Sequence, residues 1–139
     1  MRTVFERMEV LVAQIRDLVV DCRHPASLAR FWAAALDGYG VAAYDEAELD
    51  RLRAAGIYDT EDDPAVLVEP SPRGGPRLFF QLVPENKIAK NRVHLDLTSA
   101  DVPAEIERLT GLGARVLAEH EHWVTMADPE DNEFDLMPL

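Results

Sequence analysis

The chain has 139 residues, of which 47% are hydrophobic and 29% are charged, and its formal net charge is −12. This length predicts a single domain over residues 1–139 with a sizeable core, and the acidic balance excludes nucleic-acid backbone binding, which needs a basic surface. The sequence contains neither an apolar run long enough to span a membrane nor a secretory leader, and its single cysteine, Cys22, forms no intramolecular disulfide, so we expect a cytoplasmic protein without a membrane partner.

The first half of the chain predicts a strand, a helix and three further strands. Residues 1–13 are mixed and predict a peripheral lead-in element, whereas apolar residues alternate over 15–22 as in a half-buried strand. A helix begins near Pro25 and has an apolar stripe formed by Leu28, Phe31, Trp32 and Ala35. The other elements predicted here are strands at 41–44, 65–69 and 77–83, a helix at 46–55 and a turn at 71–76.

The second half repeats this order after a polar linker at about 85–91. Its predicted strands cover 92–98, 114–119, 122–127 and 133–137, and its helix follows the N-cap Asp101 with a stripe of Ile106, Leu109 and Leu112. The repeat predicts an α+β duplication of two βαβββ modules, the first at about 14–84 and the second at about 92–138.

The predicted strands carry apolar side chains on one face and polar side chains on the other. Because antiparallel sheets often expose one side to water, the polar face is either a solvated surface or the lining of a polar cleft. Its members are Asp17, Asp21, Arg77, Gln81, His94, Asp96, Thr98, Glu133 and Asp135.

Several motifs together resemble the glyoxalase-like domain proteins of the vicinal oxygen chelate superfamily, which includes glyoxalases, bleomycin-resistance proteins and extradiol dioxygenases. The resemblance covers most of residues 14–137. The motifs are VDCRHP at 20–25, LARFW at 28–32, PRLFFQLVPE at 76–85, Lys87, KNRVHLDL at 90–97, GLGA at 111–114, MADPE at 126–130 and NEF at 132–134.

The resemblance implies an open, cup-like barrel of curled, mostly antiparallel sheet with helices outside, and a small molecule bound in the cup. Dimers are frequent in the superfamily, and a cup of two half-sheets leaves edge strands that native proteins tend to cover, so we expect a homodimer. The activities of the superfamily include isomerisation, ring-cleaving dioxygenation, epoxide opening and drug sequestration. The fold does not choose among them.

Metal-using members of the superfamily hold one divalent ion with a side chain from each outer strand of each module. The resemblance assigns these positions to Asp17, Gln81, His94 and Asp135. The first position is commonly His and the second and fourth are commonly Glu, so His94 alone is a standard ligand. Three oxygen donors and one imidazole suit Mn²⁺, Fe²⁺, Ni²⁺, Zn²⁺ or Mg²⁺.

Other polar and aromatic residues are candidates for proton transfer and substrate binding. A carboxylate of the cup, Glu133 or Asp135, is expected to move a proton. Lys87, Lys90 and Arg92 form a basic cluster that is a candidate clamp for an anionic substrate. Trp123 and Tyr58 are candidates for aromatic residues that stack on a ligand. The expected substrate contacts are Arg77, Asp96, Trp123 and Lys90.

Each of these residues also has a purely structural interpretation. His94 is alternatively a partly buried histidine hydrogen-bonded to Asp96 or to a backbone carbonyl, and Glu133 caps the turn before it. His120 and His122 could share a metal but fit exposed turn residues better. Lys87, Lys90 and Arg92 are then a solvated linker, and Cys22 is inert on the helix-facing side.

Three functions therefore remain open at this point. The first is a metal-dependent lyase, isomerase or dioxygenase of the glyoxalase type. The second is a metal-free protein that binds or sequesters a small molecule, and the third is a protein with a decayed site that acts through dimerisation.

Overall fold

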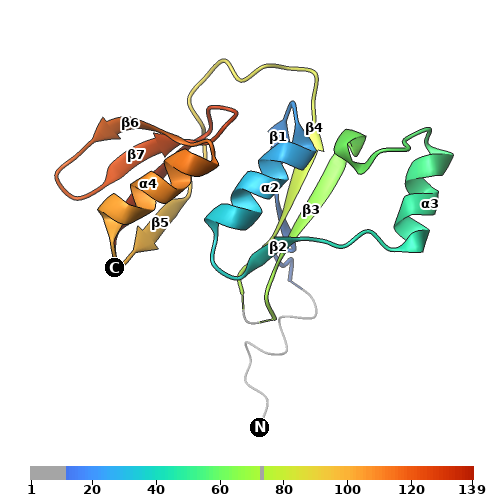
Figure 1. The fold of residues 1–139 in the computed structure, drawn as a ribbon, viewed down its shortest axis with the longest axis horizontal. Coiled ribbons are helices and arrows are strands. Elements are labelled where there is room, and N and C mark those ends of the chain that lie inside the picture. The colour runs from blue at the N-terminus through green and yellow to red at the C-terminus, as the bar shows by residue number, and fades with distance from the viewer. Residues whose placement is uncertain (1–11, 73) are drawn as a thin grey trace, which may run out of the picture.

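The computed structural model describes residues 12–72 and 74–139, so most of the predicted lead-in element at 1–13 lies outside the described residues. Within the described residues the strands form two four-stranded sheets, in the orders β1-β4-β3-β2 and β5-β8-β7-β6. Figure 1 shows them side by side, joined by an extended linker. This is the predicted α+β duplication, and the two sheets remain open rather than closed into one barrel. None of the described helices is long and apolar enough to cross a membrane.

The first module follows the predicted order, including the helix expected at 46–55, which lies outside the βαβββ repeat. β1 pairs in parallel with β4, and β3 pairs antiparallel with both β4 and β2. The strand predicted at 41–44 ends earlier, because the following residues lead to Asp45, whose side chain accepts a hydrogen bond from the Glu48 backbone amide and caps the next helix. The elements are β1 (Asp17–Cys22), α2 (Pro25–Ala35), β2 (Tyr39–Val41), α3 (Glu46–Ala54), a short 3₁₀ helix (Thr60–Asp62), β3 (Ala65–Pro70) and β4 (Arg77–Leu82).

The second module has the same arrangement without α3. Its first strand begins later than predicted, at Asp96. Before that residue the backbone amide of Asn91 donates to the Glu133 side chain rather than to a strand, and Leu95 accepts a hydrogen bond from the Asp135 amide of β8. The elements are β5 (Asp96–Ser99), α4 (Val102–Leu112), β6 (Arg115–Glu119), β7 (Val124–Ala127) and β8 (Glu133–Pro138).

The two modules share one hydrophobic core. The helices α2 and α4 contact each other, and each packs against the sheet of its own module (Figure 1); the whole predicted stripe of α2 is buried. On α4, Leu109 is buried but Leu112 is 39% exposed, so the buried stripe ends before the predicted one. The ring of Trp32 on α2 packs edge-on against Phe134 on β8, with 5.2 Å between their centroids. Aromatic packing therefore connects the first module to the second.

A buried carboxylate also connects the modules. Asp128 begins the turn between β7 and β8, which is rich in Asp and Asn, but is only 1% exposed. Its side chain accepts hydrogen bonds from the indole nitrogen of Trp32 at 2.9 Å and from the backbone amides of Glu130 and Asn132. Burial raises the pKa of Asp128, and these donors oppose that rise. The turn thus anchors β8 to α2.

Candidate metal centre

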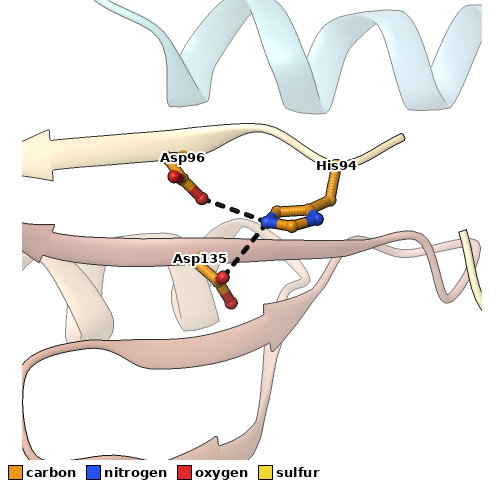
Figure 2. A group of neighbouring side chains, drawn as sticks. All are labelled: His94, Asp96 and Asp135. Atoms are coloured by element: carbon orange, nitrogen blue, oxygen red, sulfur yellow. Dashed lines mark ion pairs between the residues drawn. The ribbon is translucent and has the colours of Figure 1, made fainter. Parts of the chain in front are cut away.

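Three side chains converge on the helix-free face of the second sheet (Figure 2). The Nε2 atom of His94 lies 3.2 Å from Oδ1 of Asp96 and 3.3 Å from Oδ2 of Asp135. Asp96 and Asp135 are paired in the β5–β8 ladder, and His94 lies two residues before Asp96. Because strand side chains alternate with a period of two, all three point to one side.

The donor set of this cluster suits a divalent cation. One donor atom from each side chain lies within 4.8 Å of the others. Among the described residues, these three form the group of histidine, cysteine or acidic side chains that is close enough to hold one ion. Two atoms bound to one ion at about 2.1 Å lie about 3.0–3.5 Å apart, close to the distances seen here. The side chains of His94, Asp96 and Asp135 are 41%, 58% and 18% exposed, so an ion and a ligand have access. One imidazole and two carboxylates suit first-row divalent ions and Mg²⁺.

Asp17 occupies the equivalent place in the first module but is engaged differently. It lies as far ahead of the N-cap of α2 as His94 lies ahead of the N-cap of α4. Its carboxylate accepts two hydrogen bonds from Arg77, at 2.7 and 3.2 Å, and one from Arg16 at 2.9 Å. The hydrogen bond from the Arg77 guanidinium lowers the pKa of Asp17. Asp17 is thus paired with arginines and is not part of the cluster.

Gln81 lies further along the first sheet. It pairs with Asp21, whereas Asp17 pairs with Arg77, four positions earlier on β4. At about 3.3 Å per residue the two side chains start about 13 Å apart along the strands. The position of β4 that corresponds to Asp135 is instead Phe79. Of the four predicted metal ligands, the structure therefore brings His94 and Asp135 together, and it adds Asp96, which the sequence suggested as a substrate contact.

Glu133 holds the linker to the second sheet. Its carboxylate accepts hydrogen bonds from the Lys87 ammonium at 3.0 Å and from the Asn91 backbone amide at 2.9 Å. Burial by itself would raise the pKa of Glu133, but the bonds from Asn91 and Lys87 outweigh burial, and the pKa is lowered. This carboxylate is therefore held ionised by the linker, which suits an anchor better than a proton acceptor.

The other predicted substrate contacts lie in separate places. Arg77 is bound to Asp17, with its guanidinium carbon 5.5 Å from the ring centroid of Phe79. Trp123 stacks on His120 at 4.5 Å in the turn between β6 and β7, whereas Lys90 is exposed on the linker. Asp96 alone of this group joins the cluster.

Two residues near the cluster were not recognised as site residues from the sequence. The Thr125 hydroxyl on β7 donates to Oδ1 of Asp135 at 2.7 Å, and Nε2 of His120 lies 3.2 Å from the same hydroxyl. His120 and His122 do lie in a turn, as the structural interpretation expected. Alternation along 124–127 places Thr125 on the polar face, but pairing with Asp135 depends on register.

A cavity of about 410 Å³ lies between the first sheet and α3. Its wall contains a partly buried pair, in which the Tyr44 hydroxyl donates to Oδ2 of Asp63 at 2.7 Å. Burial raises the pKa of Tyr44, so its hydroxyl stays protonated. Leu67 and Phe79 supply apolar wall and Arg51 a charged rim. No pattern in the sequence pointed to this cavity, because residues 42–63 show little periodicity.

Comparisons with known proteins give the same fold. A family model described as Glyoxalase-like domain matches residues 17–137. A fosfomycin resistance protein, FosX, from Mesorhizobium loti is 11% identical with a TM-score of 0.61, and the match covers 91% of each chain. FosX from Listeria monocytogenes is 9% identical with a TM-score of 0.60, covering 92% of this chain and 93% of that one.

A third solved structure is a glyoxalase/bleomycin resistance protein/dioxygenase family enzyme from Burkholderia phytofirmans. It is 12% identical, with a TM-score of 0.57, and the match covers 91% of this chain and 98% of that one. Among curated proteins, none matches this chain. These identities support the fold alone, whereas the family model spans nearly the whole described chain. The chain belongs to the glyoxalase-like domain family of the vicinal oxygen chelate superfamily.

Proposed function

We propose that this protein is a metal-dependent lyase, isomerase or dioxygenase of the glyoxalase type, with a divalent ion held by His94, Asp96 and Asp135. The observation that carries the proposal is the convergence of one imidazole and two carboxylates on an accessible sheet face. When bound, such an ion polarises the oxygens of a small molecule. Of the ligands expected from the resemblance, the proposal retains His94 and Asp135.

The protein's own groups would bind the molecule and move a proton. Asp96 is the most exposed of the three donors, so it is best situated to exchange a proton with a bound molecule. Asp135 is held by Thr125 and has less freedom to do so. Glu133 is engaged by Lys87 and Asn91, and we assign it to fixing the linker beside the site.

Metal content tests this proposal directly. Purified protein, stripped with a chelator and titrated with Mn²⁺ or Ni²⁺ in a calorimeter, is expected to bind about one ion per chain. Elemental analysis of the protein as purified gives the natural metal. A parent protein that binds neither ion would overturn the metal-dependent function.

A second candidate function is metal-free binding or sequestration of a small molecule in the cavity of the first module. Its volume of about 410 Å³ is in the range of small-molecule sites, and its lining combines apolar side chains with the hydrogen-bonded Tyr44–Asp63 pair and the charged Glu48 and Arg51. A ligand for this cavity should raise the melting temperature in the presence of EDTA. Ala43→Arg, which places a long side chain in the wall, should abolish the shift, whereas Ala47→Arg on exposed α3 should preserve it.

We also propose that the protein is a cytoplasmic homodimer. Among the described residues β1 and β5 border their sheets; Val19 on β1 and Val93 just before β5 are exposed, as is Ile88 on the linker. Native proteins tend to cover such edges and apolar groups. Sedimentation at micromolar concentration should give twice the chain mass of 15.6 kDa. A monomer under these conditions would contradict the dimer.

A further inference from the structure

A line of hydrogen bonds leads from the candidate metal centre to a second histidine. Oδ2 of Asp135 faces His94, while Oδ1 of the same carboxylate accepts the Thr125 hydroxyl at 2.7 Å. The Thr125 oxygen in turn lies 3.2 Å from Nε2 of His120. Oδ2 of Asp135 therefore faces His94 within the cluster, whereas Oδ1 is bound by Thr125 outside it.

The direction of these bonds follows from the number of protons available. A threonine hydroxyl has one proton, and an ionised carboxylate can only accept. Because Thr125 donates its proton to Asp135, its oxygen must accept the bond from His120. This requires the form of His120 that carries its proton on Nε2.

The β6–β7 turn holds His120 in place for this bond. The His120 backbone amide donates to the Trp123 carbonyl at 2.9 Å, and the two rings stack with 4.5 Å between centroids and 22° between planes. Thr125 is fixed by the sheet, since it is the direct partner of Asp135 in the β7–β8 ladder. The sheet therefore fixes the backbone of Thr125, and His120 is oriented by contacts outside the metal centre.

We propose that Thr125, supported by His120, is a positioning residue of the metal centre, an inference that rests on the metal-dependent function proposed above. By occupying Oδ1, Thr125 limits rotation of the Asp135 carboxylate and presents Oδ2 toward His94 and Asp96. Outer groups of this kind orient metal ligands, and their loss typically weakens metal binding about 10–100-fold. Because Thr125 occupies Oδ1, Asp135 would offer an ion its other oxygen, Oδ2.

Substitutions at Thr125 test this role by calorimetric titration of the full chain with Mn²⁺. Thr125→Val removes the hydroxyl but keeps the shape, and we expect binding about 10–100-fold weaker than that of the parent. Thr125→Ser keeps the hydroxyl and should restore binding. The matched control is Thr98→Val, the same change on β5 at a residue that pairs with Met137, and it should bind as the parent does.

His120→Phe tests the outer part of the line. It keeps an aromatic ring against Trp123 but removes the Nε2 donor, so we expect a loss of affinity in the same direction but smaller than that of Thr125→Val. The melting temperature of each metal-free variant separates a structural role from positioning. A structural role predicts lower melting temperatures with unchanged affinity.

The outcomes distinguish this inference from the function on which it rests. A parent that binds no Mn²⁺ or Ni²⁺ overturns the metal-dependent function. A parent that binds about one ion, together with a Thr125→Val variant that binds within about twofold of it, overturns the positioning role alone. Weak binding by Thr125→Val, rescued in Thr125→Ser, supports it.

Discussion

The helix-free faces of the two sheets have the same strand arrangement but carry different side chains. In the first module, Asp17 and Val19 on β1 lie opposite Arg77 and Phe79 on β4. In the second module Asp96 pairs with Asp135, and the residues two positions earlier in the sequence, which correspond to Asp17 and Arg77, are His94 and Glu133. The duplication therefore preserved the apolar, helix-facing side chains and changed the outward-facing ones.

This difference shows how one fold either neutralises a charge or concentrates it. In the first module the Asp17 carboxylate, which is 7% exposed, forms a bidentate salt bridge with Arg77. In the second, two carboxylates approach one imidazole nitrogen in a chain of net charge −12. Like charges at this spacing repel, and a divalent cation would remove the repulsion. The first face is thus stable without an ion, whereas the second favours one.

The strongest test of this comparison replaces His94 and Asp17 separately. His94→Ala removes the nitrogen donor, so we expect divalent-ion binding to fall by more than about 100-fold while the fold survives. Asp17→Ala should leave ion binding unchanged. Both are measured by calorimetry, with melting temperatures on the same samples. Loss of the ion in Asp17→Ala would show that the first module contributes to the centre.

The contact between the modules is tested at Asp128. Asp128→Ala leaves the Trp32 indole and two backbone amides without their acceptor, and we expect the free energy of unfolding to fall by about 2–4 kcal/mol. Asp62→Ala, the same change at an exposed position, should stay within about 0.5 kcal/mol of the parent. Urea unfolding provides the values. Equal effects at the two sites would contradict the anchoring role.

Glu133 has no acidic counterpart in the first module, where Arg77 takes its place. Glu133→Gln weakens the contacts with Lys87 and Asn91 and should lower the free energy of unfolding by about 1 kcal/mol. Hydrogen exchange at the Asn91 amide should accelerate. Glu85→Gln, an exposed change on the same linker, serves as the control. Unchanged exchange at Asn91 would contradict the anchoring of the linker by Glu133.

The smallest expected effect concerns the pH dependence of the Asp17–Arg77 pair. Arg77 lowers the pKa of Asp17 below its ordinary value of 3.8, so the pair stabilises the fold above that value. The contribution is lost as the pH falls through the lowered pKa. Arg77→Gln should therefore melt slightly below the parent at about pH 7, and the difference should shrink at about pH 2. A difference that persists in acid would exclude this charge pairing as its cause.

The sequence by itself determined the duplicated architecture and the side of the sheet on which the chemistry lies. The stripe of α2 and the alternation of β1, β4 and β8 are local periodic patterns, and each fixes which side chains face the core. That is why His94 and Asp135 could be predicted to share a face. The resemblance of the chain to a known family added the expectation that these side chains bind a metal ion.

Tertiary structure alone decided which side chains on these faces meet. Gln81 and Phe79 both point outward from β4, and only the pairing of β4 with β1 shows that Phe79, not Gln81, corresponds to Asp135. The bond from Thr125 to Asp135 and that from Trp32 to Asp128 likewise join residues on different elements. Periodicity is a property of one segment, whereas register and module packing depend on the partner segment, which no single stretch of sequence encodes.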